Sequence, residues 1–492
     1  MTNITEERKD FKSFERELFE LMCKIACGLI QQYLEWRDLT VMALRDKSRY
    51  RIIGKNRDST IKTLFGEVGY RRRYYYDLDE CRYVFLLDEA MGIDCGCGLI
   101  SENLAEQIVL ECADKSFRKA ADSIGAITGQ CISAMGAWNV LQRYGGAIGE
   151  QEARLKELYD SGSAGHLGGI PSPALFEEYD DVWIPRQREH RRKPGTAAKG
   201  AKKIGKKPGK LPMHVGIAYT GWTQTEHGRH STANKIAHAS FGKPAEFMEM
   251  FGALLGHRYD MDGVVRRITN GDGEPWIRTA AELNDSVLQL DPFHRCQAVV
   301  RAVSDKSDRK LLFAAIDKKD VDGVLSGICE MAMDARDESE QKKLTKLYGY
   351  FHSNRDSFLT WQERGIELPA PPEGIVYRSL GVQESSNCMI TQRMKHRRGS
   401  WSERGANNMA RILCYRSTIG LEAILGVLPE PEPLEAFAEP LSAAKSPQCD
   451  GKGYGADWLQ APMPFDEAFK THGREAIRRM LRMKPISGLS FI

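Results

Sequence analysis

Three aspartates, Asp180, Asp272 and Asp291, stand within or at the ends of predicted strands. Ligands of open α/β sheets gather beyond the carboxyl ends of strands. Carboxylates that converge there repel one another unless a cation lies between them. Their oxygens suit Mg²⁺ or Mn²⁺, and two such ions about 4 Å apart activate an attacking oxygen and stabilise a leaving one in phosphodiester chemistry. The aspartates therefore indicate a site for two divalent metal ions that acts on a phosphodiester.

The stretch "ITNGDGEPWI", residues 268–277, isolates one of these aspartates. A β-branched run stops at Asn270, and Asp272 follows between Gly271 and Gly273. Glycines on both sides would let the protein backbone come close to a bound strand. Aspartate is also a common turn residue, and the spacing alone favours a turn. The stretch by itself leaves both interpretations open.

Asp180 lies inside the predicted strand "ALFEEYDDVWIPRQ", residues 174–187. Because side chains alternate along a strand, Asp180 shares one face with Phe176, Glu178, Val182 and Ile184. An aspartate in line with three apolar residues either sits at a solvated strand end or is held by another group. The neighbouring Asp181 would face the other side of the strand.

Basic residues gather in two further places. Arg71, Arg72 and Arg73 precede three tyrosines, which puts cations and stacking faces on one ribbon, although an ordinary exposed strand explains this almost as well. Residues 186–210 hold eleven lysines or arginines and one acid, and their Gly, Pro and Ala content indicates a basic loop. Charge of this density favours a nucleic acid partner. The lysines of this loop include Lys202, Lys203, Lys206 and Lys207.

The composition fits a soluble, cytoplasmic protein. Of the 492 residues, 42% are hydrophobic and 28% are charged, as in globular chains. This length suggests roughly two to four domains. No apolar run approaches the ~18 residues needed to span a bilayer, and the N-terminus lacks signal-peptide character. The twelve cysteines have no repeating spacing, which indicates reduced thiols.

The N-terminal part is expected to form helices and a β-hairpin. Residues 11–45 predict an amphipathic helix that packs on its neighbours through a stripe of Phe14, Leu18, Met22, Ile25, Leu29 and Tyr33. Residues 60–87 have strand character. Residues 101–144 predict three helices, with Gly125 between the second and a third that opens near Thr128. This arrangement is typical of a helix-turn-helix whose third helix enters the major groove, but any three-helix bundle has the same pattern.

From about residue 174 strands alternate with helices, which predicts an α/β sheet covered by helices. Residues 300–365 then lack strands, which indicates a helical insertion into this domain. The predicted division is 1–58, an N-terminal helical region; 59–100, a β-hairpin region; 101–150, a helix-turn-helix region; 170–299, the first part of the core; 300–372, the insertion; 373–427, the final part of the core; and 428–492, a C-terminal tail.

Six stretches, in order over roughly residues 60–415, resemble the ISLre-two family of bacterial insertion-sequence transposases, distant relatives of the Mutator type. They are "TLFGEVGYRRRYYYD", "YVFLLDEAMG", "ALFEEYDDVWIPRQRE", "ITNGDGEPWI", "LDPFH" and "GVQESSNCMITQRMKHRRGSWSERGANNMARIL". The resemblance implies a ribonuclease-H-like catalytic core with an all-α insertion. Helical and helix-turn-helix/β-hairpin DNA-binding regions would precede this core.

The resemblance also implies an acidic triad. Its first two members are Asp180 and Asp272, and its third is Glu384 in "VQESSN", on a helix after the insertion. Asp291 and His294 in "DPFH" match a Mutator-type signature that supports the active site or positions DNA. Glu178 and Glu274 are the rival third or accessory carboxylates, and Glu384 is preferred because the implied core places its last acid on a helix after the sheet.

A transposase of this type would bind terminal inverted repeats, nick DNA and join the freed 3′-OH to target DNA with two Mg²⁺ or Mn²⁺ ions. Joining two ends suggests a homodimer or larger oligomer on double-stranded DNA, in the cytoplasm at the nucleoid. The phosphates would be neutralised by residues 186–210 and by the stretch "RMKHRRG", with Arg393, Lys395, Arg397 and Arg398. A DNA-binding protein without catalysis and a metal-dependent nuclease are the rival functions.

Overall fold

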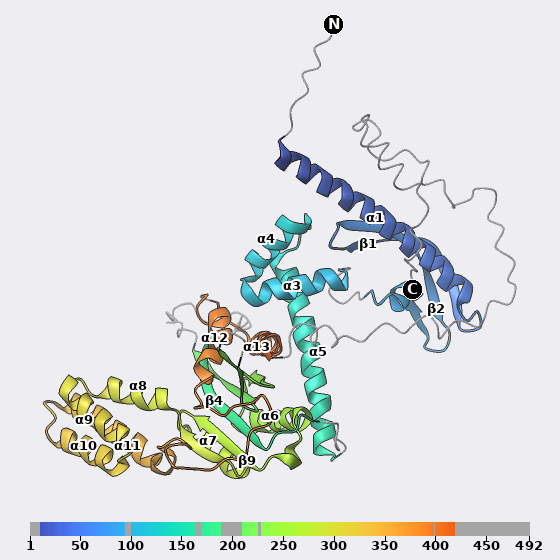
Figure 1. Cartoon of the computed structure of the whole chain (residues 1–492). Helices are drawn as coiled ribbons and strands as arrows, with labels where there is room; N and C mark the ends of the chain where they lie inside the picture. Colours follow the sequence, from blue (N-terminus) through green and yellow to red (C-terminus); the bar gives the residue numbers. More distant parts are fainter. Residues whose placement is uncertain are drawn as a thin grey trace, which may run out of the picture. The chain divides into compact units, whose positions relative to one another are not determined.

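The computed structural model describes residues 10–93, 100–162, 169–187, 209–224, 228–397 and 399–418 (Figure 1). All of them belong to one compact unit, Met1–Pro433. In this part of the chain no helix combines the length and the apolarity needed to cross a membrane. The predicted tail, 428–492, lies outside the described residues, as do Lys202, Lys203, Lys206, Lys207 and Arg398.

A five-stranded mixed sheet forms the centre of the α/β part, as the alternation of strands and helices predicted. Its order is β10-β9-β4-β5-β8. The strand β5 runs antiparallel to its neighbours β4 and β8, whereas β4, β9 and β10 are parallel to one another. The carboxyl ends of β9 and β10 therefore lie together, beside the middle of the longer strand β4. The strands span β4 Ala174–Pro185, β5 Lys210–Tyr219, β8 Ile236–Ser240, β9 Arg266–Gly271 and β10 Val287–Leu290.

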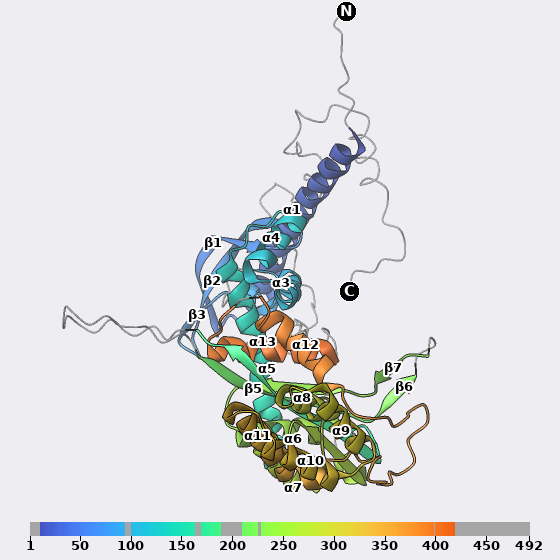
Figure 2. The same cartoon turned by 90° about the vertical axis from the view of Figure 1, so that its left-hand side faces the viewer.

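Helices cover both faces of this sheet (Figures 1 and 2). On one face, Phe176, Val182 and Ile184 of β4 pack in a core with apolar residues of the last two helices. On the other face, Leu175 and Tyr179 pack with the helices that follow β8 and β9. The alternation of β4 between two buried faces explains why nearly the whole strand is buried. The covering helices are α12 Gln383–Met394 and α13 Glu403–Thr418 on the first face, and α6 Pro244–Arg258 and α7 Pro275–Leu283 on the second.

The segment expected as a helical insertion forms a second, smaller core. Val299, Leu312, Ile328, Leu347 and Phe351 are among its buried side chains. Its first helix begins at Pro292, directly after Asp291, so this helical block starts earlier than the predicted boundary at residue 300. The helices are α8 Pro292–Ala302, α9 Lys306–Asp317, α10 Val321–Met333 and α11 Glu338–Ser353, followed by the 3-10 turn Arg355–Ser357.

Three helices precede the sheet: α3 Glu102–Asp114, α4 Phe117–Thr128 and α5 Ala134–Asp160. Ser101 and Ser116 cap the first two, because their hydroxyls accept from backbone N–H groups three residues on. Gly125 lies inside α4, and Gly129 ends it in a left-handed conformation. The third helix therefore opens at Ala134 rather than near Thr128, which corrects the predicted turn.

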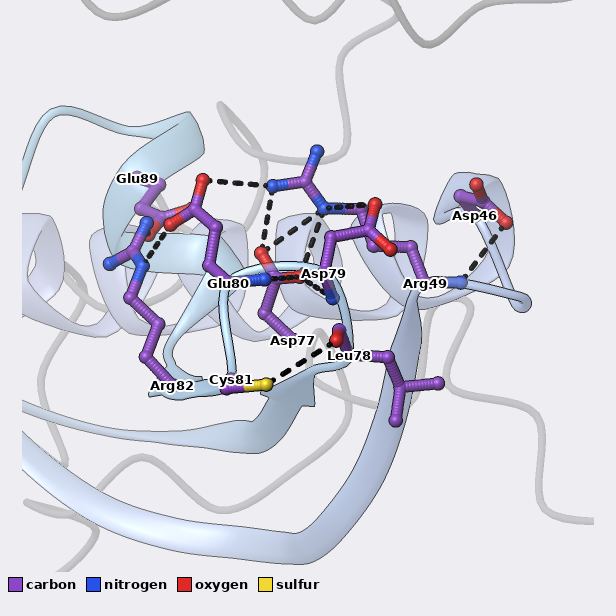
Figure 3. Close-up of polar contacts among 9 residues, drawn as sticks. All are labelled: Asp46, Arg49, Asp77, Leu78, Asp79, Glu80, Cys81, Arg82 and Glu89. Carbon is purple, nitrogen blue, oxygen red and sulfur yellow. Dashed lines mark hydrogen bonds and ion pairs between the residues drawn. The ribbon is translucent and has the colours of Figure 1, made fainter.

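The N-terminal region consists of a 34-residue helix on a three-stranded antiparallel sheet. At one end of the sheet, Arg49 holds the last turn together by donating to Asp77 at 2.8 Å and to Glu80 at 3.0 Å (Figure 3). The hydrogen bonds from Arg49 lower the pKa of Asp77 to about 2. The elements are α1 Phe11–Leu44, β1 Tyr50–Lys62, β2 Glu67–Asp77, β3 Arg82–Val84 and α2 Leu86–Ala90.

The apolar stripe predicted on α1 does not face this sheet. Leu34 packs against the hairpin with Cys27 and Ile30 beside it, and Val41 is buried as well. Large apolar side chains on the opposite side of the helix, Phe14 and Leu18 among them, are exposed. Packing on neighbouring elements of the same chain was therefore the wrong expectation for this stripe.

Candidate functional site

Asp180 and Asp272 lie next to each other in the sheet, one on the central strand β4 and the other directly after β9. The parallel ladder between β4 and β9 ends with Tyr179 opposite Gly271. Asp180 is the next residue after Tyr179, and Asp272 is the next residue after Gly271. Neighbouring strands lie about 4.8 Å apart, so the two carboxylates share one small region. Asp272 follows the carboxyl end of β9, where α/β sheets bind their ligands, and Asp180 lies beside it within the longer strand β4.

The pKa values of these two groups are shifted together. Burial raises the pKa of Asp180 to about 6, and the negative charge of Asp272 adds to the rise. Burial also raises the pKa of Asp272, to which the charge of Asp181 contributes. The imidazole of His294 acts in the opposite direction on both aspartates. Buried carboxylates that disfavour each other's charge are a physical reason to expect a cation between them.

Asn387 on α12 orients the first aspartate. Its Nδ2 donates to Oδ2 of Asp180 at 2.5 Å, and its Oδ1 accepts from Gln383 at 3.0 Å. Glu384 lies three positions before Asn387 on the same helix, and residues at this spacing are neighbours on a helix surface. The side chain of Glu384 is exposed. The structure therefore brings Asp180 and Asp272 together and leaves the predicted third acid outside their contact.

Glu178, the rival carboxylate on β4, has a structural role: it accepts hydrogen bonds from the start of α12. It is completely buried, and the first backbone N–H groups of α12, those of Gly381, Val382 and Gln383, donate to it at 3.0–3.3 Å. The hydroxyl of Tyr219 donates to it at 2.6 Å. Burial raises the pKa of Glu178, while these hydrogen bonds work against the rise. A carboxylate inside the sheet thus fixes the start of the helix that carries Asn387 and Glu384.

Asn270 connects this carboxylate to the next strand end. Its Nδ2 donates to Glu178 at 3.0 Å and to Asp291 at 2.7 Å, and its Oδ1 accepts from Gln289 at 3.0 Å. Asp291 in turn caps α8 by accepting from the N–H groups of Phe293 and His294. A buried network of hydrogen bonds therefore links β4, β9 and β10, close to the end of β9 that Asp272 follows. Asp291 supports the site, and it holds the helix that brings His294 near the aspartates.

Asp181 points away from Asp180, as strand alternation predicts. Its Oδ1 lies 2.6 Å from Nδ1 of His214 on the neighbouring strand. The ring of His214 packs at 5.1 Å from Trp276, which also contacts Tyr179. Trp276 is thus a packing residue. Glu274, the other rival acid, is exposed, and partial desolvation followed by the charge of Asp272 raises its pKa.

The helical insertion contacts the turn that holds Asp272. The hydroxyl of Tyr350 on α11 donates to the backbone carbonyl of Asp272 at 2.5 Å. Gly273 follows with a φ of +90°, and a Cβ at this position would lie 2.7 Å from Nδ2 of Asn354. Glycine is therefore required here both by the backbone conformation and by the close approach of Asn354.

The predicted DNA-contacting arginines divide into two groups. Arg72 is buried in an ion pair with Asp88, and Arg73 pairs with Asp38, so both stabilise the N-terminal region internally. Arg393 is also buried, where it donates to the carbonyl of Cys112 at 2.6 Å. These internal roles correct the expectation of phosphate contacts for the three residues. Among the described residues predicted to contact DNA, the exposed side chains are those of Arg71, Lys395 and Arg397.

The described residues do not hold a complete metal-binding group. Nowhere among them do three or more His, Cys, Asp or Glu side chains converge in a way that could hold a metal ion. Two oxygen ligands, Asp180 and Asp272, nevertheless fit a divalent cation by their chemistry and by their raised pKa values. Sequence reasoning did not identify Asn387, Asn270 or Tyr350. The only signal for Asn387 was its spacing of three from Glu384.

A family model described as "Uncharacterised protein family (UPF0236)" matches residues 4–423. Similar proteins include a UPF0236 protein of Caldanaerobacter subterraneus subsp. tengcongensis, 22% identical over 407 residues, or 82% of this chain and 76% of the relative. A UPF0236 protein in the vanSb 3′ region of Streptococcus gallolyticus is 24% identical over 438 residues, or 84% of this chain and 86% of the relative.

Two solved structures are also similar to part of the chain. A pre-cleavage Mos1 transpososome is 11% identical and covers 53% of this chain and 79% of its own, with a TM-score of 0.12. The Mos1 strand transfer complex has the same identity and TM-score and covers 53% and 78%. A TM-score this low does not establish a shared fold.

Proposed function

Since this chain belongs to UPF0236, a family described as uncharacterised, its activity has to be inferred from its own site, and we propose that it is a DNA transposase. It would cut DNA at the ends of an insertion sequence and join the freed ends to target DNA. The observation that carries this proposal is the pairing of the buried Asp180, within β4, with the half-buried Asp272, directly after the neighbouring strand β9, both with raised pKa values.

The sheet supports the ribonuclease-H-like core that the resemblance to insertion-sequence transposases implies. Its central strand β4 carries the first acid, and the adjacent parallel strand β9 leads to the second. The one reversed strand, β5, and the return of the chain through a helix to the first face fit that core. The third acid of the proposed triad, Glu384, begins that returning helix.

Each residue of the site has a proposed task. Asp180, Asp272 and, with DNA bound, Glu384 would hold Mg²⁺ or Mn²⁺. When bound, two such ions would supply an activated oxygen nucleophile and stabilisation of the leaving oxygen. Asn387 orients Asp180, and His294 offsets part of the negative charge at the site. The exposed cations Arg71, Lys395 and Arg397, with the basic segment 186–210, would neutralise DNA phosphates.

The name of the Caldanaerobacter relative gives further support. It joins eleven loci under one protein name. A protein sequence that recurs at many places in one genome is what a mobile element leaves behind. This concerns the relative, and we extend it to the present chain only as part of the proposal.

The test uses the purified full-length protein, a labelled duplex that carries the terminal repeat of its own element, and Mg²⁺ or Mn²⁺. We expect 3′-end nicks and joined products that Asp272→Asn abolishes while DNA binding persists. Asp285→Asn is the matched control, because this exposed turn residue with φ +47° precedes β10 and lies away from the carboxyl ends of the strands. It should keep full activity.

Three outcomes would contradict the proposal in different ways. DNA binding without cleavage in either metal would indicate a DNA-binding protein that lacks catalysis. Nicks without any joined product would indicate a metal-dependent nuclease. Cleavage that survives in Asp272→Asn would show that the chemistry occurs elsewhere in the chain.

A further inference from the structure

Helix α1 carries an apolar stripe that no part of the hairpin covers. Its members recur at steps of three, four and seven, and between 43% and 55% of each side chain is exposed; they are Phe14, Leu18, Met22, Leu29, Tyr33 and Trp36. Ile25 fills the step of seven and is half-buried. We call these seven residues the α1 stripe.

The α1 stripe lies opposite the face by which the helix is anchored. At 100° per residue, its members fall within about 60° of one line along the helix, whereas Leu34, which packs on the hairpin, and Val41, which is buried, lie about 120–140° away. A helix that is apolar on two separate sides has two partners. The hairpin is the first, and the stripe indicates a second.

We propose that the partner is the α1 helix of a second copy of this chain. Steps of three and four are the pattern of the seam between paired helices, in which each apolar side chain fits between residues of the facing helix. Two copies present the same stripe, so the surface is self-complementary, as a twofold interface requires. The 34 residues of α1 are ample for a helix pair.

The amount of apolar surface fits this partner. Six exposed members of the α1 stripe and Phe11, which lies on the same line, are large apolar side chains. Large side chains of this kind bury about 150–250 Å² each when they are fully covered, so seven half-exposed ones offer roughly 700 Å² per chain in total. This is about the area that each partner contributes to a stable interface of standard size.

The charge of α1 argues against a membrane surface or DNA as the partner. Between Phe11 and Leu44 the helix has four basic and five acidic residues. A helix that lies on anionic lipid or on phosphates needs an excess of basic charge, which α1 lacks. A mixed polar surface around an apolar seam is instead what paired helices have.

The position of α1 within the family argues for a second copy over the C-terminal part of the chain. The family model includes α1, since it begins at residue 4, but it ends at residue 423. Residues 424–492 therefore lie outside the region that the family model matches. A second copy of the chain, in contrast, is a partner that every protein matched by this model has available.

The test is the mass of the full-length protein in solution, without DNA or metal, by analytical ultracentrifugation over a range of concentrations. We expect a dimer for the natural sequence. Leu18→Lys with Leu29→Lys should weaken the dimer by about 100-fold or more, because each change places a charge in the seam. Both positions are exposed in the single chain, so the variant should keep its helix content and its melting temperature.

The matched control adds the same charge on the polar side of α1. Ser13→Lys and Gln31→Lys lie four residues before Glu17 and Glu35, with which the new lysines can pair. This variant should remain a dimer. A monomeric natural protein at tens of micromolar, or a Leu18→Lys, Leu29→Lys variant that stays dimeric, would overturn the proposal. Because the measurement involves no DNA, its failure would leave the proposed transposase activity intact.

Discussion

The hydroxyl of Tyr350, near the end of the helical insertion, donates to the backbone carbonyl of Asp272 at 2.5 Å. These residues lie 78 positions apart, and the contact ties the insertion to the turn that presents one of the two buried aspartates. Next to it, Asn354 fills the space beside Gly273. The insertion is therefore part of the structure that sets the position of Asp272.

Replacing Tyr350 by phenylalanine should affect activity more than stability. Loss of one hydrogen bond costs about 1 kcal/mol. A shift of Asp272 by a fraction of an ångström should slow strand cleavage by about 10- to 100-fold, because catalysis depends on the positions of the reacting groups. Single-turnover cleavage and thermal unfolding measure the two effects. Tyr348→Phe, on the same helix, is the control; equal rates for the two variants would exclude a positioning role for Tyr350.

Asp180→Asn should stabilise the protein in a pH-dependent way. Folding raises the pKa of Asp180 from 3.8 to about 6, so the folded state binds its proton more tightly than the unfolded chain does. This contribution is fully present below about pH 4 and is lost as the pH rises through about 6. In the absence of metal, we expect equal stability at about pH 4 and a gain of roughly 2–3 kcal/mol for the variant at about pH 8.

Denaturant unfolding at several pH values measures this difference. Asp285→Asn, at an exposed turn, should differ from the natural protein by the same small amount at every pH. A variant at position 180 that is less stable at about pH 8 would mean that the ionised carboxylate is already compensated without metal.

Glu178→Gln should loosen the start of α12. The amide can accept fewer hydrogen bonds than the carboxylate and turns an N–H group towards the donors of Val382 and Gln383. A buried acceptor lost in this way costs about 2–4 kcal/mol. Hydrogen exchange should become faster in residues 381–394. Glu384→Gln, an exposed change in the same turn, should leave exchange unaltered, and slow exchange in both variants would refute the capping role.

The exposed cations after α12 should govern the salt dependence of DNA binding. Removing Lys395 and Arg397 together should lower the slope of log affinity against log salt by about 2, with little change in melting temperature. Arg393→Ala should instead lower the melting temperature, because the bond to Cys112 and the packing on Trp401 are lost. A reduced slope for Arg393→Ala at unchanged stability would show that this buried arginine reaches DNA after all.

Local patterns were sufficient to predict the strands of the sheet and the places of the two aspartates. Alternation along β4 puts Phe176 and Val182 on one face and Tyr179 on the other, and the structure has this arrangement. A β-branched run that ends before a glycine also located the end of β9. These features depend on neighbours in the sequence, so one chain is enough to recognise them.

Contacts between residues that lie far apart in the sequence could not be predicted. Nothing near Arg72 or Arg393 indicates that each guanidinium turns inward, because Asp88 and Cys112 become neighbours only after folding. The same is true of Glu178, whose backbone donors at the start of α12 lie more than 200 positions later. The stripe of α1 was recognised as apolar, but its periodicity could not reveal which side of the helix the hairpin occupies.

The seating of α12 on Glu178 has a consequence for synthesis. Glu178 and Gln383 lie 205 positions apart, and the ribosome adds about 5–20 residues per second. For roughly 10–40 s the nascent chain therefore contains Glu178 but not the backbone N–H groups of residues 381–383 that donate to it in the folded protein. Translation that stops within the insertion would leave this strand permanently incomplete, so truncated products should be substrates for cellular proteases.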